Sequence, residues 1–456
     1  MSEFHNKHIG PTSKEVTEML TALECNSLND LLEKIVPKNI LDIDGESIGN
    51  ENFSENDILK YVKELGSKNK IFRSLIGQGY YDTITPNVVL RNILESPGWY
   101  TQYTPYQPEI SQGRLEALLN YQTMISQICE LPIANASLLD EGTAASEAML
   151  MFYRKNRSSS NKFLIDENCF QQTIDVIVSR AEPLGIEIEI TSYENFDYTD
   201  AFGCIVQYPD RFGRIANPDA YKKITDAAHE CKCKVIFATD LMCLQLFKAP
   251  GSFEADVAVG NSQRFGVPLG YGGPHAAFMT TTEEFKRDIP GRIVGVSQDR
   301  RENQAYRLTL QTREQHIRRE KATSNICTAQ VLLAIISSMY AIFHGPKKLK
   351  EIANKIHNHT KNLAEKLSVQ GHEIILDNQS YFDTLSIKLN NLDHNTLEER
   401  ALNKLFNFKY HDDGLVGISL DEKTSDSEIE QISRLFITDS NSVSYTHLTL
   451  PTTPYV

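Results

Sequence analysis

The sequence predicts a doubly wound α/β protein with a mostly parallel sheet and a smaller carboxyl-terminal α+β domain. Between residues 111 and 280, short apolar runs typical of strands alternate with helical patterns, and the connections are short. A break at Gly345 and Pro346 is followed by mixed helices and strands. With 456 residues, the chain is long enough for two or three domains.

Composition and charge restrict the classes of partner and location. The formal net charge of -14 excludes nucleic acid as a partner, because its phosphates would be repelled. No run of 18 apolar residues is present, so a membrane-spanning helix is excluded as well. The eight cysteines lack C-x-x-C spacing, which predicts reduced thiols and no zinc or other metal site. The start shows neither a signal peptide nor a transit peptide. A cytoplasmic location is therefore predicted, or the mitochondrial matrix if the source is eukaryotic.

Residues 1–95 are predicted to form an amino-terminal helical region and an arm. Thr12 and Glu15 have capping-box spacing ahead of apolar residues at helical intervals, and a second helix is expected over 27–36. We expect the apolar faces of both helices to lie in a core. A third helical segment follows a polar linker, and a fourth runs from residue 85 to 94.

Residues 99–112 combine tyrosines with two prolines. Because proline restricts φ at its own position and at the one before it, this stretch is predicted to be a rigid, extended loop. Such a loop suits the lining of a pocket, since tyrosine joins an apolar ring to a polar tip. It also suits an arm between subunits, and the two interpretations are compatible.

A large α/β domain is predicted over residues 96–344. Strands followed by helices and short connections imply a parallel sheet that is covered on both faces. The expected strands are 162–166, 186–190, 204–208, 234–240, 255–259 and 276–280, and the expected helices include 114–129, 219–231, 282–288 and 322–343.

The small domain is predicted over residues 345–440. A helix over 347–367 precedes strands near Ile374 and at 385–389, and two further helices begin near Thr396 and Ser425. Residues 443–456 lack apolar periodicity, and their beginning resembles a translated sequencing adaptor. We expect this tail to be non-native and the sequence to be truncated.

Gly142 and Thr143 stand at the start of an alanine-rich helix. A small-residue turn there exposes backbone N–H groups and the positive end of the helix dipole, which suits a phosphate. The alternative interpretation is an ordinary N-cap with close helix packing.

Four runs of residues resemble one known family, the glycine cleavage system P-protein, and the resemblance covers about residues 8–436. The runs are YTPYQPE at 103–109, ASLLDEGTAA at 136–145, FGVPLGYGGPH at 265–275 and QTREQHIRR at 311–319. The sequence is most similar to the amino-terminal half of the family's long form. The resemblance implies the fold type I of pyridoxal phosphate enzymes, of which aspartate aminotransferase is an example.

In that family, the carboxyl-terminal half holds the lysine that binds the cofactor, in a His-Lys-Thr-Phe context. The corresponding run here is SQRF, so Gln263 occupies the lysine position. An amide cannot form an imine with the cofactor aldehyde. The resemblance therefore implies that this half lacks the covalent anchor, and that the other half binds the pyridoxal phosphate.

Further members of a degenerate cofactor site follow from the same resemblance. Asp240, at the end of a strand, fits the aspartate that would hold the ring nitrogen protonated. Phe170 lies where a ring-stacking side chain is expected, and Gly142 with Thr143 lies where the phosphate would bind. A capping role for Asp240 and simple burial of Phe170 are the alternative interpretations.

A basic cluster over residues 307–321 concentrates arginines in an acidic protein. It suits the carboxylate of glycine, an acidic partner such as the lipoylated H-protein, or the other half of the enzyme. The alternative interpretation is a solvated face with internal ion pairs. The residues that we predict to reach a shared channel are Thr104, Tyr106 and Arg313.

The predicted function is the amino-terminal, non-Schiff-base half of glycine dehydrogenase (aminomethyl-transferring). Its predicted partners are the carboxyl-terminal catalytic half, lipoylated H-protein and glycine, in a dimer of fused chains or a heterotetramer. Alternatives are a separate non-catalytic subunit of the same enzyme and a purely structural scaffold. A self-sufficient enzyme would need another lysine, and Lys248 lies only eight residues after Asp240, which is a poor position for it.

Overall fold

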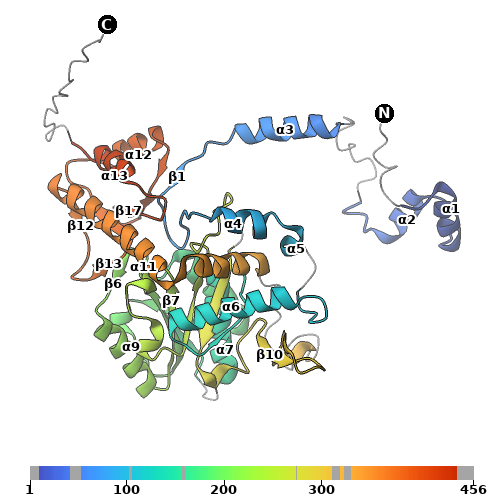
Figure 1. The fold of residues 1–456 in the computed structure, drawn as a ribbon, viewed down its shortest axis with the longest axis horizontal. Helices are drawn as coiled ribbons and strands as arrows, with labels where there is room; N and C mark the ends of the chain where they lie inside the picture. The colour runs from blue at the N-terminus through green and yellow to red at the C-terminus, as the bar shows by residue number, and fades with distance from the viewer. Residues whose placement is uncertain are drawn as a thin grey trace, which may run out of the picture. The chain divides into compact units, whose positions relative to one another are not determined.

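The computed structural model describes residues 10–41, 53–101, 105–156, 160–273, 275–310, 319–322 and 330–438. It forms two compact units, which divide between Ile71 and Phe72 (Figure 1). The predicted tail at 443–456 lies outside the described residues, and the domain boundaries given above stay predictions.

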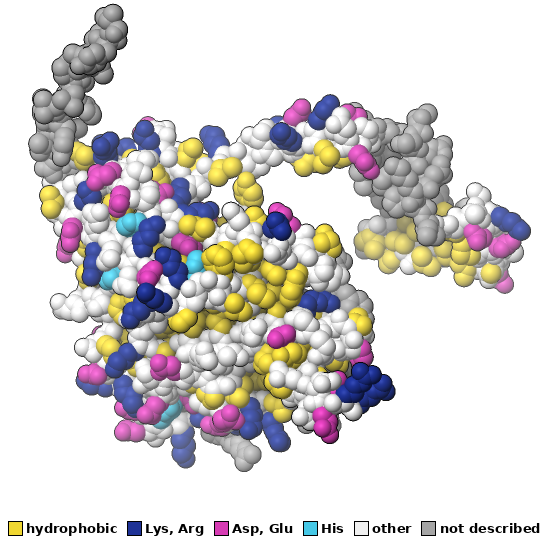
Figure 2. All heavy atoms as spheres, in the orientation of Figure 1, with side chains coloured by type: hydrophobic (Ala, Val, Ile, Leu, Met, Phe, Trp, Pro, Cys, Tyr) yellow, Lys and Arg dark blue, Asp and Glu magenta, His cyan; other side chains and the backbone are white. Residues whose placement is uncertain are grey.

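The first unit contains three helices with side-chain caps, α1 (Ser13–Ala22), α2 (Leu28–Ile35) and α3 (Glu55–Ser67). The predicted capping box of α1 is confirmed, since the Thr12 side chain accepts from the Glu15 N–H and Glu15 bonds back to the Thr12 N–H. The expectation of a buried apolar face is wrong, because none of the three helices buries a side chain. Figure 2 shows apolar side chains at the surface of this unit. Periodicity identifies an apolar face but not what covers it.

Seven strands form the large sheet of the second unit, in the order β2-β9-β8-β7-β5-β3-β4. The five strands from β8 to β4 pair in parallel, whereas β9 pairs antiparallel with β8, and β2 pairs antiparallel with β9 at the edge. The predicted doubly wound class is confirmed. The strands are β2 (Ile133–Ala134), β3 (Lys162–Asp166), β4 (Glu187–Thr191), β5 (Ala201–Tyr208), β7 (Lys234–Asp240), β8 (Val257–Asn261) and β9 (Ala277–Thr281).

Helices cover both faces of this sheet, because alternate strand residues are apolar on both sides. In β7, Val235 and Phe237 belong to one core, and Ile236 and Ala238 belong to the other. The first core is closed by α6 (Gln112–Cys129), α9 (Pro218–Glu230) and the start of α11 (Val331–Val369), and the second by α7 (Glu141–Lys155) and α8 (Gln171–Ala181).

A smaller antiparallel sheet with the order β12-β14-β17-β16 lies beyond α11. The predicted break in α11 is confirmed, since Gly345 has a φ of 67°. This part comprises β12 (Glu373–Ile374), β14 (Thr384–Lys388), β16 (Lys409–Tyr410), β17 (Leu415–Ser419), α12 (His394–Asn403) and α13 (Asp426–Leu435), around a third core. Two short pairs connect it to the rest of the second unit, β1 (Arg73–Ser74) with β15 (Phe406–Asn407) and β6 (Arg214–Ile215) with β13 (Ser380–Tyr381).

Several local details differ from the predictions, and of the expected helix over 282–288 only a short 3-10 turn, η7 (Glu283–Phe285), is present. The stretch 99–112 is not extended throughout, since Trp99 and Tyr100 lie in α5 (Pro97–Tyr100) and Gln112 begins α6. Proline is tolerated in the first turn of a helix, where its missing N–H has no partner in any case. The predicted helix over 85–94 consists of α4 (Asn87–Val89) and a π-helical turn, η2 (Leu90–Leu94). A hairpin of β10 (Val294–Gln298) and β11 (Gln304–Leu308) was not predicted.

Candidate functional site

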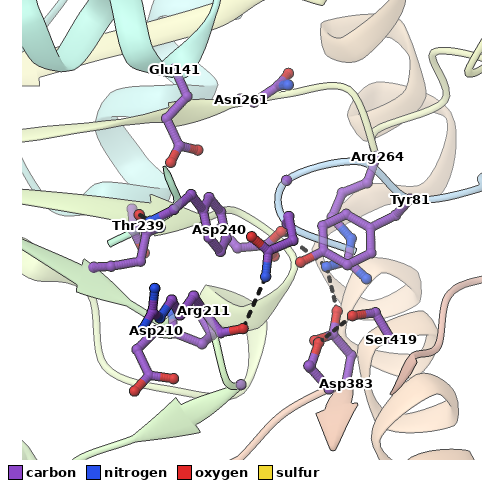
Figure 3. Close-up of a pocket in the computed structure, with 17 residues that line it drawn as sticks. Tyr81, Glu141, Asp210, Arg211, Thr239, Asp240, Asn261, Arg264, Asp383 and Ser419 are labelled. Atoms are coloured by element: carbon purple, nitrogen blue, oxygen red, sulfur yellow. Dashed lines mark hydrogen bonds and ion pairs between the residues drawn. The ribbon is translucent and has the colours of Figure 1, made fainter. Parts of the chain in front are cut away.

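A pocket lies beyond the carboxyl ends of β7 and β8, where ligands gather in open α/β sheets (Figure 3). Its walls come from the sheet, from the small domain and from residues 73–85, which we call the crossing segment. The side chains leave little free space between them. The lining residues are Gln78, Gly79, Tyr81, Glu141, Phe170, Gln207, Pro209, Asp210, Arg211, Gly213, Thr239, Asp240, Asn261, Arg264, Asp383, Thr384 and Ser419.

Asp240, the last residue of β7, uses both of its carboxylate oxygens. Its Oδ1 accepts from the backbone N–H groups of Met242 and Cys243, each at 2.8 Å, and so caps the turn that follows the strand. Its Oδ2 accepts from Arg264 Nη1 at 2.9 Å. The carboxylate thus caps a turn and also takes part in a buried ion pair.

Arg264 is the central cation of the pocket. Its Nη1 also donates to Asp383 Oδ2 at 2.7 Å, and the side chains of Arg264 and Asp383 are each only 3% exposed. The guanidinium carbon lies 3.9 Å from the centroid of the Tyr81 ring. Burial opposes the charge of Arg264, but the two carboxylates outweigh it and raise the arginine pKa. The arginine therefore stays charged inside the protein.

Gln263 is fully buried and does not line the pocket. Its Nε2 donates to the backbone oxygens of Tyr81 and Val267, at 2.6 and 2.7 Å, and its Oε1 accepts from the Tyr81 N–H at 3.0 Å. Both atoms of the amide are therefore engaged with backbone groups. Its neighbour Arg264 is the residue whose side chain lies in the pocket.

The start of α7 carries negative charge. Asp140 Oδ1 accepts from the Thr143 N–H at 2.7 Å and acts as the N-cap. A Cβ on Gly142 would lie 3.2 Å from the Val176 side chain and 3.3 Å from the Gln172 oxygen, so this glycine allows α7 and α8 to pack closely. Glu141 lies in the first turn and lines the pocket. The cap and the first turn are acidic, which disfavours a phosphate there.

Glu141 is a carboxyl group without a cation among the described residues. Burial raises its pKa to about 8, and the nearby Asp240 and Asp140 contribute to the increase. Its Oε1 has no hydrogen-bond partner within the described part of the chain, and the same holds there for Thr239 Oγ1 and Arg264 Nη2. These polar atoms suit ordered water or a small polar molecule in the remaining space.

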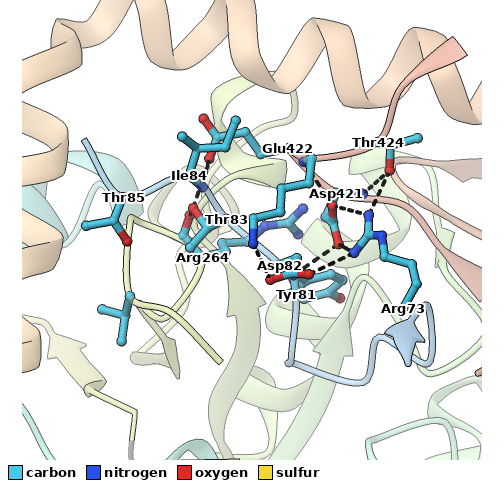
Figure 4. Close-up of polar contacts among 12 residues, drawn as sticks. Arg73, Tyr81, Asp82, Thr83, Ile84, Thr85, Arg264, Asp421, Glu422 and Thr424 are labelled. Carbon is cyan, nitrogen blue, oxygen red and sulfur yellow. Dashed lines mark hydrogen bonds and ion pairs between the residues drawn. The ribbon is translucent and has the colours of Figure 1, made fainter. Parts of the chain in front are cut away.

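The crossing segment joins the sheet to the small domain (Figure 4). On the sheet side, Thr85 Oγ1 donates to the Gly266 oxygen at 2.7 Å. On the small-domain side, the Ile84 N–H donates to Glu422 Oε2 at 2.9 Å. Arg73 forms a bidentate pair with Asp421, with 2.6 and 2.7 Å between the atoms, and also binds Glu428 at 2.8 Å. These contacts hold the pocket closed on this side.

Comparisons with known proteins identify the family. The model of the glycine cleavage system P-protein matches residues 6–436. The chain belongs to the glycine cleavage system P-protein family. It is 51% identical over 437 residues to a glycine dehydrogenase (decarboxylating) of Nostoc sp., covering 96% of this chain and 44% of the relative. It is 48% identical over 443 residues to the mitochondrial enzyme of Dictyostelium discoideum, covering 95% of this chain and again 44% of the relative. The chain thus spans less than half the length of these relatives.

Solved structures agree with the family and the fold. A glycine decarboxylase (P-protein) in inhibitor-bound form matches with a TM-score of 0.81 and 29% identity, covering 94% of this chain and 99% of that chain. A structure of C-DES with glycine covalently linked to its PLP cofactor matches with a TM-score of 0.56 and 11% identity, covering 79% and 97%. The predicted fold type I of pyridoxal phosphate enzymes is confirmed.

The P-protein family uses pyridoxal phosphate, but the residues of this pocket do not fit it. No lysine lines the pocket in the described part of the chain, and the amide of Gln263 is engaged by backbone groups. The start of α7 is capped by Asp140. Arg264 projects into the space beside Asp240. Among the described lining residues, the pocket therefore offers no amine for the cofactor aldehyde, and it has an acidic helix start and an arginine beside Asp240.

The structure brings only some of the predicted site residues together. Phe170 and Asp240 line the pocket, whereas Gly142 and Thr143 are buried beside it. Phe170 packs against the crossing segment, since a Cβ on Gly79 would lie 3.6 Å from its ring. Lys248 is exposed and is not part of the lining. Tyr106 lies under Arg292, whose guanidinium carbon is 5.0 Å from the ring centroid, and Thr104 and Arg313 lie outside the described residues.

Sequence reasoning missed Arg264, Asp383, Tyr81 and Glu141. For Arg264 the available signal was that it is the single charged residue between positions 257 and 274. Among the described residues, no group of three His, Cys, Asp or Glu side chains is placed to hold a metal ion. The same part of the chain contains no helix with the length and apolar character needed to cross a membrane.

Proposed function

We propose that this chain is the amino-terminal, non-Schiff-base half of glycine dehydrogenase (aminomethyl-transferring). As the resemblance implies, the complete enzyme decarboxylates glycine with pyridoxal phosphate and passes the aminomethyl group to the lipoyl group of H-protein. The observation that carries the proposal is the buried amide of Gln263, which is held by the backbone of Tyr81 and Val267. An amide has no free amine for the cofactor aldehyde, so the isolated chain is inactive.

In this scheme, the chain contributes shape and contacts rather than a chemical step. It supports the catalytic half and forms part of the channel through which glycine and the lipoyl arm reach the other cofactor. Thr104, Tyr106 and Arg313 are proposed channel residues. Of these, Tyr106 is half-buried beneath the Arg292 guanidinium, which fixes the direction of its ring.

Two arrangements of the complete enzyme are compatible with this role. The relatives that are about 50% identical are more than twice as long, which favours a fused chain. The solved P-protein chain is matched over 99% of its length, which favours a separate subunit of this size. A dimer of fused chains and a heterotetramer correspond to these two cases. The cytoplasmic location stays a prediction.

Cofactor trapping with borohydride tests the proposal. The full chain is incubated with pyridoxal phosphate, alone and with a catalytic half, then reduced and mapped by mass spectrometry. We expect the stoichiometric adduct on a lysine of the added half and glycine decarboxylation only in the mixture. A stoichiometric adduct on this chain, or decarboxylation by this chain alone, contradicts the proposal.

A channel role is distinguished from a pure scaffold by Tyr106→Phe in the reconstituted enzyme. If Tyr106 reaches the channel, loss of its hydroxyl is expected to lower aminomethyl transfer to H-protein by about tenfold, the effect of one lost hydrogen bond. Tyr61→Phe on exposed α3 serves as the control and is expected to keep full activity. Full activity of both variants would favour the scaffold.

A further inference from the structure

Three charged side chains from distant parts of the chain meet in the pocket. Asp240 ends β7, Arg264 follows β8, and Asp383 stands directly before β14 of the small domain (Figure 3). Arg264 Nη1 lies 2.9 Å from one carboxylate and 2.7 Å from the other. A single guanidinium therefore connects the large sheet to the small domain.

A buried carboxylate is costly unless a cation compensates it. In enzymes of this fold, the strand-end aspartate has such a partner in the protonated ring nitrogen of the cofactor. In this chain, the Arg264 guanidinium holds Asp240 and lies against the Tyr81 ring at 3.9 Å. The guanidinium is planar and positively charged, and it donates to the aspartate. A protonated cofactor ring has the same three properties and would interact with Asp240 in the same way.

We propose that Arg264 replaces the protonated cofactor ring as the partner of Asp240, and that its second bond to Asp383 makes the former cofactor pocket an ion-paired junction closed to pyridoxal phosphate. This inference rests on the proposed function, since it assumes a half that has lost its cofactor. In this inference, Arg264 excludes pyridoxal phosphate from the pocket, which Gln263 alone would not do. Even with a lysine at position 263, the aspartate of the pocket would already be paired with Arg264.

The first test measures whether Arg264 compensates the two carboxylates. In the full chain, Arg264→Met leaves Asp240 and Asp383 buried without a cation, and we expect the unfolding midpoint to fall by about 4 °C at pH 8. The triple variant Arg264→Met, Asp240→Asn and Asp383→Asn removes both charges, while asparagine keeps an acceptor oxygen for the Met242 and Cys243 N–H groups. We expect it to regain more than half of the loss. If the triple variant instead loses as much in its unfolding midpoint as the separate substitutions together, the proposal would be overturned.

The second test measures cofactor exclusion. Gln263→Lys and the double variant Gln263→Lys with Arg264→Thr are incubated with pyridoxal phosphate, reduced and mapped at position 263. We expect the double variant to trap at least about ten times more cofactor there than the single variant, which corresponds to about 1.4 kcal/mol. Stoichiometric trapping by Gln263→Lys alone, or equal trapping by both, would overturn the proposal. Circular dichroism confirms that each variant is folded before the comparison.

These outcomes are distinct from failure of the proposed function. The thermal midpoints and the adduct at position 263 are measured on this chain without a catalytic half. An unmutated chain that traps cofactor on another lysine would contradict the proposed function and leave the charge compensation by Arg264 intact. Conversely, the chain could restore activity together with a catalytic half while the midpoint losses of the substitutions simply add. That result would contradict only the role of Arg264.

Discussion

The amide of Gln263 connects the segment after β8 to the crossing segment. Its three hydrogen bonds satisfy both backbone groups of Tyr81 and the carbonyl of Val267. Buried backbone groups without partners are costly, so the side chain has a structural role of its own. A lysine at this position could not form all three bonds, because its ammonium group has no acceptor atom.

Gln263→Ala is expected to lower the free energy of unfolding by about 2–4 kcal/mol, because it leaves three buried backbone groups unpaired. Urea denaturation measures the change. Gln171→Ala is the matched control, since Gln171 is exposed and its side chain bonds the Asp175 side chain; it should shift stability by less than about 0.5 kcal/mol. Equal effects of the two substitutions would show that the bonds of Gln263 carry little stability.

Glu141→Gln is expected to stabilise the protein at high pH. Burial raises the folded-state pKa of Glu141 to about 8 from its ordinary value of 4.5. The folded state thus binds more protons than the unfolded state between these values, and the contribution of this residue to stability falls as the pH rises through that window. At pH 9 the variant should exceed the unmutated chain by about 1–3 kcal/mol, with little difference at pH 4. Urea denaturation at the two pH values measures this, and a difference that is independent of pH would contradict the ionisation argument.

At the level of single residues, the sequence pattern located some members of the pocket but not their partners. Position 263 is recognisable because a family motif surrounds it. The partner Asp383 lies 119 residues after Arg264, and no local pattern connects them. Asp240 was expected either to hold the ring nitrogen of the cofactor or to act as a cap. In the structure it caps the turn after β7 and pairs with Arg264, a partner that was not predicted.

The crossing segment is the element on which the closure of the pocket depends. Gly77 has a φ of 68°, and a Cβ there would lie 2.0 Å from Ser419 Oγ and 2.6 Å from Ser419 Cβ. The segment therefore approaches β17 too closely for any side chain at this position. Glycine meets both the conformational and the spatial requirement.

Gly77→Ala is expected to destabilise the protein more than Gly185→Ala, which provides a matched control. Gly185 has a similar φ of 64°, but a Cβ added there would meet nothing within 4 Å. The control should cost about 1–2 kcal/mol from backbone strain alone, and Gly77→Ala a further 1–3 kcal/mol, roughly, from overpacking against β17. Chemical denaturation of both variants measures the difference. Equal costs would mean that the segment moves away from β17 without loss.

The strands and helices of the large domain were predictable, whereas several orientations were not. Alternating elements with short connections indicate a parallel sheet, and β3, β5 and β7 lie where the pattern placed them. The reversed direction of β9 and the β10–β11 hairpin have no signal in periodicity, which is the same for strands of either direction. Two-residue strands such as β1 and β15 are too short to show any period.

For the second unit as a whole, the ion-pair network around Arg73 links its beginning to its end in sequence. Arg73 precedes the sheet elements, whereas Asp421 and Glu428 belong to the last part of the small domain. The Asp421 side chain is 2% exposed, and this arginine is its ion-pair partner. The small domain and the crossing segment should consequently unfold together.

Arg73→Met is expected to cost about 3–5 kcal/mol, because it leaves a buried carboxylate unpaired. Lys388→Met is the control: it removes an ion pair between two largely exposed side chains and should cost less than about 0.5 kcal/mol. Hydrogen exchange followed by mass spectrometry should show α12, α13 and β17 exchanging faster only in the first variant. If these three elements exchange at the same rate in both variants, the Arg73 network does not hold the small domain in place.

If this half has lost its cofactor, as we propose, the junction at Arg264 also bears on whether that loss is reversible in evolution. A mutation that restores lysine at position 263 would break the bonds to Tyr81 and Val267 and gain no cofactor while the arginine stays. A mutation that removes the arginine first would expose two buried charges. Under the proposed function, each single step would lower stability, so a path to a cofactor-binding half would require simultaneous changes. Such epistasis would entrench the proposed division of labour between the two halves.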